Sequence, residues 1–320
     1  MAEPIESHAR VGVVHFAAYP QCAGGEGPIL ESLARIAEDE FFGAVEVTAI
    51  SDPAVRREAR ALLDGSHMDV IFGCQPAILG HKLSLSALDR AEQERAIAAC
   101  RELIDQAYEL GARILMVMSG PDPGERDRAP AREAFADALK QLCRHAQERA
   151  EEYILAISVE TFDRDVDKKC LIGPTHEAAG IVEAVKAECS NIGLTLDLSH
   201  QPLIGEPIGE MLVEAADSLI HAHFGNCVLR DRAHPLYGDH HPPFGIPSGE
   251  NDVEELRLFL EALIYSGYFA KSVPTGMPVL SMEIRPAAGQ RPEVVIANGK
   301  RTLREAWARL SHDRWTEGRL

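Results

Sequence analysis

The feature that most constrains the fold of this sequence is a regular alternation between short apolar runs and longer amphipathic segments. Apolar residues recur at helical spacing between the runs, as in segment 88–112, where Gly111 is placed as a C-terminal helix stop. Strands that alternate with helices in this way form parallel sheets. The composition of the runs predicts eight strands, at residues 9–16, 43–50, 69–75, 112–120, 153–161, 192–200, 219–226 and 278–286.

Eight strand–helix units over about 280 residues predict an α/β fold of the (β/α)8 TIM-barrel type, which typically needs about 250 residues. A doubly wound open sheet is the structural alternative, and it would place a G-x-G-x-x-G phosphate turn after the first strand. The glycines after that strand, Gly24, Gly25 and Gly27, do not have this spacing. Because no linker, repeat or low-complexity tract interrupts the chain, we expect residues 1–320 to form a single TIM-barrel domain.

Charge and cysteine usage limit the class of protein. The net charge of −18 at pH 7 disfavours a surface that binds the phosphates of nucleic acids. No apolar run approaches the roughly 20 residues of a membrane span, and the polar N-terminus has no secretory signal. The seven cysteines are scattered without a Cys-x-x-Cys pair, which is typical of reduced thiols. We therefore expect a cytoplasmic protein that binds neither nucleic acid nor membranes.

The last four predicted strands each end in a residue that can bind a metal ion. These residues are Glu160, Asp197, His223 and Glu283. The carboxyl ends of the strands meet on one face of a TIM barrel. A strand-end acid can also cap the next helix, but buried acids at consecutive apolar strand ends repel one another unless a cation compensates them. Three carboxylates and one imidazole predict a site for one divalent cation, such as Mn²⁺, Mg²⁺, Co²⁺ or Zn²⁺.

Other polar residues near the strand ends are candidates for substrate binding. His200 lies one turn beyond the second of the four ligands and is expected to hydrogen-bond a substrate oxygen, the alternative being a surface histidine. His221 alternates with His223, so both side chains face the same side. We expect a buried, hydrogen-bonded role for His221, the alternative being a fifth metal ligand. His15 and Gln75, at the ends of the first and third strands, are expected to line the pocket.

The segment 227–252 is too long for a simple connection, and loops of this length in compact domains are usually functional. We expect it to close over the site. Its cluster of Asp239, His240 and His241 raises the alternative of a second metal site. Adjacent side chains diverge in an extended backbone, so two ligands from His240 and His241 are not expected.

The motifs SVETF, LDLSH, HAHFGN and MEIRP, in that order, resemble the xylose isomerase-like (AP endonuclease family 2) TIM barrels. The best matches within that group are the sugar isomerases and epimerases, such as tagatose and psicose 3-epimerases and hydroxypyruvate isomerase. The resemblance implies that Glu160, Asp197, His223 and Glu283 bind one divalent metal, often Mn²⁺. It also implies that the two glutamates move protons on opposite faces of the substrate.

The resemblance has matches and departures outside the metal ligands. It implies that His200 contacts a substrate oxygen, and Arg164 matches an arginine that follows the first glutamate. The epimerases place a second glutamate where this chain has Val166, and an arginine where it has Leu229, with Arg230 one place further on. Because these positions help to recognise the substrate, the metal chemistry transfers better than the identity of the substrate. We keep Arg164 and Arg230 as candidate substrate-binding residues.

The predicted chemistry follows from one cation and two carboxylates. A cation at this site would leave positions for two adjacent substrate oxygens, and polarising the carbonyl stabilises an enediolate. Glu160 and Glu283 can then remove and return a proton. We therefore expect a metal-dependent isomerase or epimerase of keto-sugars or sugar acids. Loss of a β-hydroxyl from the same enediolate keeps open a dehydratase (lyase) of the inosose or dehydroshikimate dehydratase type.

Two further classes are less consistent with the sequence. A DNA-repair endonuclease of the same superfamily needs more histidines at the first strand ends and a basic groove, whereas this chain is strongly acidic. A non-catalytic barrel that binds a polyol would not need the pair of glutamates. The expected partner is a small-molecule carbohydrate, and the resemblance implies a homodimer or homotetramer.

Overall fold

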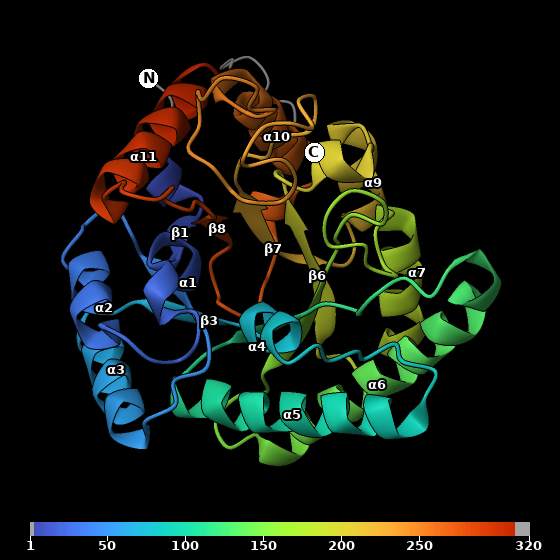
Figure 1. Ribbon diagram of the computed structural model, residues 1–320. Coiled ribbons are helices and arrows are strands. Elements are labelled where there is room, and N and C mark those ends of the chain that lie inside the picture. The colour runs from blue at the N-terminus through green and yellow to red at the C-terminus, as the bar shows by residue number, and fades with distance from the viewer. Residues whose placement is uncertain (1–2, 311–320) are drawn as a thin grey trace.

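The structure is a computed structural model that describes residues 3–310, and it confirms the TIM-barrel prediction. Eight parallel strands close into a barrel in sequential order, with helices around it (Figure 1). The barrel closes where β1 pairs with β8, with Arg10 opposite Val279 and Val13 opposite Met282. The strands are β1 (Arg10–Val14), β2 (Ala44–Val47), β3 (Asp69–Gly73), β4 (Ile114–Val117), β5 (Ala156–Glu160), β6 (Ile192–Asp197), β7 (Leu219–Phe224) and β8 (Val279–Met282).

All eight strands fall inside the predicted runs, but most of the predictions extend too far at the carboxyl end. The first run was expected to continue to residue 16, yet His15 already begins the short helix α1. The sixth was expected to reach His200, which instead caps the short helix α8. Apolar residues just after a strand are buried like those within it, so composition does not distinguish the two.

The outer layer consists of helices that cover the barrel. Asp89 accepts a hydrogen bond from the Glu92 N–H and starts α5, and Gly111 follows its end with a φ of 77°. A capping box between Asp252 and Glu255 starts α10. The helices are α1 (His15–Ala18), α2 (Ile29–Ala37), α3 (Pro53–Gly65), α4 (Gln75–Gly80), α5 (Arg90–Glu109), α6 (Arg128–Arg149), α7 (Thr175–Lys186), α8 (Gln201–Ile204), α9 (Ile208–Ala215), α10 (Val253–Tyr265) and α11 (Pro292–Ala308). None of the helices within residues 3–310 is long and apolar enough to cross a membrane.

The interior of the barrel changes from apolar to polar. A small apolar cluster is formed by strand residues alone, namely Ala44, Ile71, Ile114, Met116, Ala156 and Val279. A buried polar layer contains the hydroxyl pair Ser158 and Thr195, whose oxygens are 2.6 Å apart, together with Glu46 and His221. Space is tight here, because a Cβ on Gly12 would come within 2.5 Å of Ser281 Oγ. The burial of Glu46 and His221 shows that ionisable side chains reach the barrel interior in this chain.

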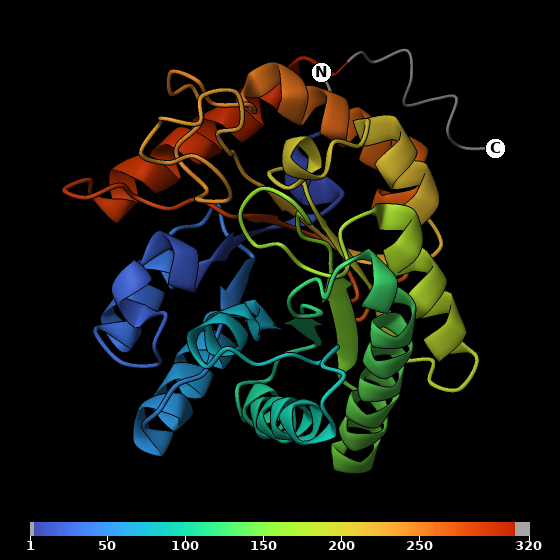
Figure 2. The same ribbon diagram turned by 45° about the vertical axis from the view of Figure 1, so that its right-hand side comes forward.

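The long segment between β7 and α10 turns back on itself. An isolated bridge pairs Val228 with Gly238. Two buried asparagines fasten its ends: Asn226 Oδ1 accepts the N–H groups of Cys227 and Asn251, and the Asn251 amide donates to the Leu198 and Gly225 carbonyls. Figure 2 shows this orange segment beside α10 and α11. The anchors hold the segment in one conformation next to the ends of β6 and β7.

Candidate metal centre and substrate cavity

The ends of β5 to β8 bring Glu160, Asp197, His223 and Glu283 to one point, with one ligand atom from each within 4.8 Å of the others. The His223 Nδ1 atom lies 3.0 Å from Glu283 Oε2, 3.4 Å from Glu160 Oε1 and 3.9 Å from Asp197 Oδ2. Asp197 and His223 are direct partners in the β6–β7 ladder, so both project from the same level of the barrel. The backbone N–H of Glu283 donates to the Phe224 carbonyl and places its side chain beside His223.

The donor atoms of this cluster suit a divalent cation. Glu160 Oε1 and His223 Nδ1 are buried and make no hydrogen bond within the described residues. Buried polar atoms without partners are costly, so their convergence indicates a missing positive ligand. Three carboxylates and one imidazole match the preferences of hard and borderline divalent ions. The residues present therefore fit the metal that the sequence predicts.

The charges of the cluster are strongly coupled. Burial raises the pKa of Glu160. Burial also acts to raise the pKa of Asp197, but the neighbouring imidazoles, foremost His200, outweigh it and lower that pKa. For His223, burial acts to lower the pKa, and the surrounding carboxylates, with Glu46 first, raise it well above its usual value. In the absence of a cation the cluster thus retains protons, and a metal must displace them to bind.

Behind the cluster, His223 contacts a fourth carboxylate that the sequence analysis missed. Its Nε2 atom lies 2.9 Å from Oε1 of Glu46, on β2, and His221 Nε2 lies 2.6 Å from the same oxygen. All three side chains are at most 1% exposed. His221 is buried and hydrogen-bonded as expected. The available signal for Glu46 was an acid at an inward-facing position, two residues after Ala44, in an otherwise apolar strand.

A second acid–histidine group adjoins the first. Asp197, His200 and His241 offer ligand atoms within 4.8 Å of one another. Asp239 joins them, with Oδ1 3.3 Å from both His200 Nε2 and His241 Nε2. His200 Nε2 and both Asp239 carboxylate oxygens make no hydrogen bond within residues 3–310. Asp197, His200 and His241 could hold a second cation, whereas His240 is not among the residues that the structure gathers there.

Lys168 also reaches this group, through a loop that Asp163 organises. The Asp163 carboxylate accepts the backbone N–H groups of Val166, Asp167 and Lys168. The Lys168 ammonium then lies 3.0 Å from Asp239 Oδ2 and 2.7 Å from Asp167 Oδ2. The Lys168 charge therefore compensates Asp239 in the metal-free protein.

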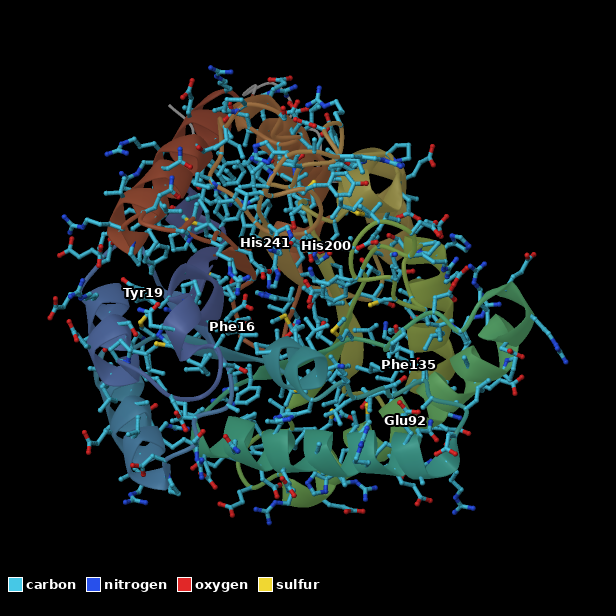
Figure 3. All side chains as sticks on the ribbon, in the orientation of Figure 1. Phe16, Tyr19, Glu92, Phe135, His200 and His241 are labelled. Atoms are coloured by element: carbon cyan, nitrogen blue, oxygen red, sulfur yellow. The ribbon has the colours of Figure 1, made fainter. Side chains whose placement is uncertain are left out.

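A cavity of about 390 Å³ opens beside the metal ligands. Its apolar wall is formed mainly by Phe16, Ala17, Ala23, Pro76, Leu79, Met116 and Phe162. Its polar wall contains Gln75, Glu160, Lys168, His223, Asp239, His241, Glu283 and Arg285. Figure 3 shows His200 and His241 next to each other near the centre, with Phe16 on the side of α1. The cavity therefore combines one wall of charged groups with one of apolar surface.

Two of the predicted substrate-binding residues lie at the centre. The Gln75 amide donates to Glu160 Oε2 at 2.5 Å, and its own Oε1 is buried without a hydrogen bond in the described chain. His200 Nδ1–H donates to the Thr161 carbonyl at 2.8 Å, and its ring packs on Phe162 with centroids 4.5 Å apart. His200 is not among the residues that line the cavity, whereas Asp239 and His241 are. Its contact with a substrate oxygen stays a prediction.

The structure places the other three candidates away from the cavity. His15 turns with α1, and its Nε2 is hydrogen-bonded to Ser32 Oγ at 2.7 Å. The Arg164 guanidinium donates to Glu177 and to the Leu171 carbonyl, at 2.7 and 2.6 Å. Arg230 is exposed and pairs with Glu250 at 2.9 Å. None of the three lines the cavity, and nearby groups bind each of them.

The fold and the site together define the class of this protein. It is a (β/α)8 barrel that carries a buried acid–histidine centre at the carboxyl ends of its last four strands. The model of the xylose isomerase-like TIM barrel family matches residues 34–282, so the chain belongs to this family. A search of curated protein sequences gave no significant match.

Solved structures with the same fold include several sugar epimerases. A D-tagatose 3-epimerase-like protein is 17% identical, with a TM-score of 0.69 over 94% of this chain and 100% of its own. The D-psicose 3-epimerase of Clostridium cellulolyticum H10 is 19% identical, with a TM-score of 0.63 over 93% and 96% of the two chains. The IolI protein, solved with a bound zinc atom, is 15% identical, with a TM-score of 0.69 over 95% and 99%. At these identities the likeness establishes the fold.

Proposed function

We propose that this protein is a divalent-metal-dependent isomerase or epimerase of a keto-sugar or sugar acid. One observation carries the proposal: Glu160 and Glu283, from strand ends that are not neighbours, converge with Asp197 and His223 at the wall of a cavity. Sugar epimerases among the solved structures with this fold support the same reaction class.

In this proposal, Glu160, Asp197, His223 and Glu283 hold one cation, for which Mn²⁺ is the first choice and Mg²⁺, Co²⁺ and Zn²⁺ are alternatives. A bound cation of this kind polarises a substrate carbonyl and stabilises the enediolate left when the neighbouring C–H loses its proton. Glu160, Asp197 and His223 are buried, which limits the access of bulk water to the site.

The two glutamates are the proposed proton carriers. Gln75 donates to Glu160 Oε2 and so fixes the orientation of the carboxylate that would accept a proton from the substrate. Burial raises the pKa of Glu160, which makes this carboxylate a better base near neutral pH. Glu283 lines the cavity and is the more exposed of the two, with 15% of its side chain accessible. Return of the proton to the same or the adjacent carbon then decides between epimerisation and isomerisation.

The cavity supports a small substrate. A volume of about 390 Å³ accommodates one monosaccharide-sized molecule and excludes a polymer. Phe16 and Phe162 offer apolar surface to the C–H faces of a sugar, while the acids and the metal ligands face its oxygens. The chemical character of the two walls thus matches the two faces of a carbohydrate.

Proton exchange from deuterated water tests the proposal whatever the product. The purified protein, loaded with Mn²⁺, is incubated with a panel of keto-sugars and sugar acids, and deuterium at carbon is followed by NMR and mass spectrometry. We expect deuterium beside the carbonyl of at least one substrate, and an absorbing conjugated product would identify dehydration instead. Glu160→Gln should lose the exchange, whereas the exposed Glu148→Gln should keep it. Full exchange in Glu160→Gln, or none in the wild type with any of the four metals, contradicts the proposal.

A further inference from the structure

Glu46 makes a contact that crosses the interior of the barrel. Strand β2, which carries it, pairs only with β1 and β3, whereas its carboxylate contacts two histidines of β7. Oε1 lies 2.6 Å from His221 Nε2 and 2.9 Å from His223 Nε2, and Oε2 lies 3.1 Å from His223 Nε2. A buried carboxylate in a strand otherwise rich in valine does not add to the apolar packing of that strand. Its contacts with the two histidines indicate a different role.

The distances within this group are those of hydrogen bonds. The Glu46–His221 and Glu46–His223 separations of 2.6 and 2.9 Å lie in the ordinary range of N–H···O hydrogen bonds or just below it. The two Nε2 atoms lie 3.1 Å apart. Direct hydrogen bonds therefore join Glu46 to both histidines.

The proton positions follow from the chemistry of the acceptor. An ionised carboxylate only accepts hydrogen bonds, so the Nε2 atoms of His221 and His223 must both carry hydrogen to bind Glu46. A histidine-to-histidine bond over 3.1 Å would compete, but a charged acceptor gives the stronger bonds. With Nε2 protonated, a neutral His223 has its lone pair on Nδ1. That atom is the one that faces Glu160, Asp197 and Glu283.

We propose that Glu46 is a positioning residue that fixes the tautomer and ring orientation of His223, so that Nδ1 is presented to the metal. The inference rests on the proposed function only in taking the cluster of His223 as a metal site. Glu46 belongs neither to the four candidate ligands nor to the residues that line the cavity, so it would act through His223. A carboxylate on the far nitrogen also makes the imidazole a stronger ligand, and losing such a partner typically costs about 10- to 100-fold in metal affinity.

Isothermal titration of the metal-free protein with Mn²⁺ at constant pH tests this role. We expect Glu46→Gln to bind Mn²⁺ at least about 10-fold more weakly than the wild type. Glu46→Asp, which keeps the charge, should recover part of the loss. The matched control is Ser158→Ala, which removes a buried polar group from the same layer of the barrel and should keep Mn²⁺ affinity within about 2-fold. Unchanged affinity in Glu46→Gln overturns the proposal.

A second measurement does not depend on the variants folding. The ¹⁵N shifts of the histidine rings in the diamagnetic Zn²⁺-loaded wild type distinguish a protonated nitrogen from one that binds metal, with His223 assigned from labelled variants. We expect hydrogen on Nε2 and metal on Nδ1, and the reverse pattern contradicts a positioning role for Glu46. Neither measurement involves substrate. A protein that binds Mn²⁺ as expected but exchanges no substrate proton would disprove the proposed function and leave the role of Glu46 intact.

Discussion

The two halves of the barrel rim have different chemistry. The ends of β1 to β4, which we call the apolar half of the rim, supply Phe16, Met116 and the α4 residues Pro76 and Leu79 to the cavity. The ends of β5 to β8, the charged half, supply all four candidate metal ligands. Gln75 is the main polar side chain that the apolar half directs at the charged half. Under the proposed function, we expect the charged half to carry the reaction and the apolar half to carry much of the substrate packing.

The largest effect is expected from a carboxylate of the charged half. Glu283→Gln removes both a candidate ligand and a proposed proton carrier, so turnover should fall at least ~1000-fold. Steady-state assays with the substrate found by deuterium exchange measure this loss, and circular dichroism checks the fold. Glu148→Gln, on the outer surface, is the control and should be indistinguishable from wild type. A Glu283→Gln enzyme with more than a tenth of wild-type turnover would contradict the assignment of the reaction to the charged half of the rim.

An intermediate effect is expected at the contact between the two halves. Gln75→Leu removes the hydrogen bond that holds Glu160 Oε2, so the carboxylate loses its fixed orientation. We expect kcat to fall about 10- to 100-fold, while Mn²⁺ affinity changes less than about 3-fold. Turnover and metal titration on the same preparation separate the two quantities. An equal loss in both would mean that Gln75 supports the metal centre rather than the reacting carboxylate.

The apolar half should respond in KM rather than in kcat. Phe16→Ala deletes a ring from the cavity wall, and we expect KM to rise about 10-fold, which corresponds to ~1.4 kcal/mol of lost substrate contact. The value of kcat should stay within about 3-fold of the wild type, because Phe16 is neither a candidate metal ligand nor a proposed proton carrier. A large fall in kcat at unchanged KM would show that the apolar half takes part in the reaction itself.

The charged half also predicts how the stability of the metal-free protein depends on pH. Burial acts to lower the pKa of His200 and His241, but carboxylates, with Asp239 first, raise them to about 10 and about 9. The folded state then binds more protons than the unfolded state between pH 6.5 and about 9–10, so stability should fall as the pH rises through that window. Thermal melting should show a decrease of a few degrees from pH 7 to pH 10. Asp239→Asn should flatten the decrease, and an unchanged slope would contradict this account.

The smallest effect is expected outside the rim. Arg230 is exposed and pairs with Glu250, so Arg230→Ala should leave KM and kcat within about 2-fold of the wild type. The same assays measure both constants. A large rise in KM would restore Arg230 as a substrate-binding residue and place part of segment 227–252 over the cavity in the bound state.

The barrel and the convergence of the four strand-end residues were predictable because both follow from patterns along the amino-acid sequence. Alternation of apolar runs and helices gives the topology, and the last residues of parallel strands meet at one face. The contact between Glu46 and His221 was not predictable in this way, since nothing in the sequence relates two strands that face each other across a barrel. The side-chain directions of His15 and Arg164 were equally hidden. The direction of His15 depends on a helix that begins at His15, inside the predicted strand, and that of Arg164 depends on a local acid, Glu177.

The pairing of Glu46 with His221 has a consequence for how the chain folds. The two residues are 175 positions apart in sequence, and contacts of such separation form late because a large loop must close first. Glu46 therefore emerges from the ribosome well before β7. Within residues 3–310, the histidines that donate to Glu46 both lie on β7. Until β7 is in place, β2 carries an acid that lacks these two donors in an otherwise apolar strand, and burying an unpaired carboxylate is costly. Closure of the barrel through β7 supplies the partners that offset this cost.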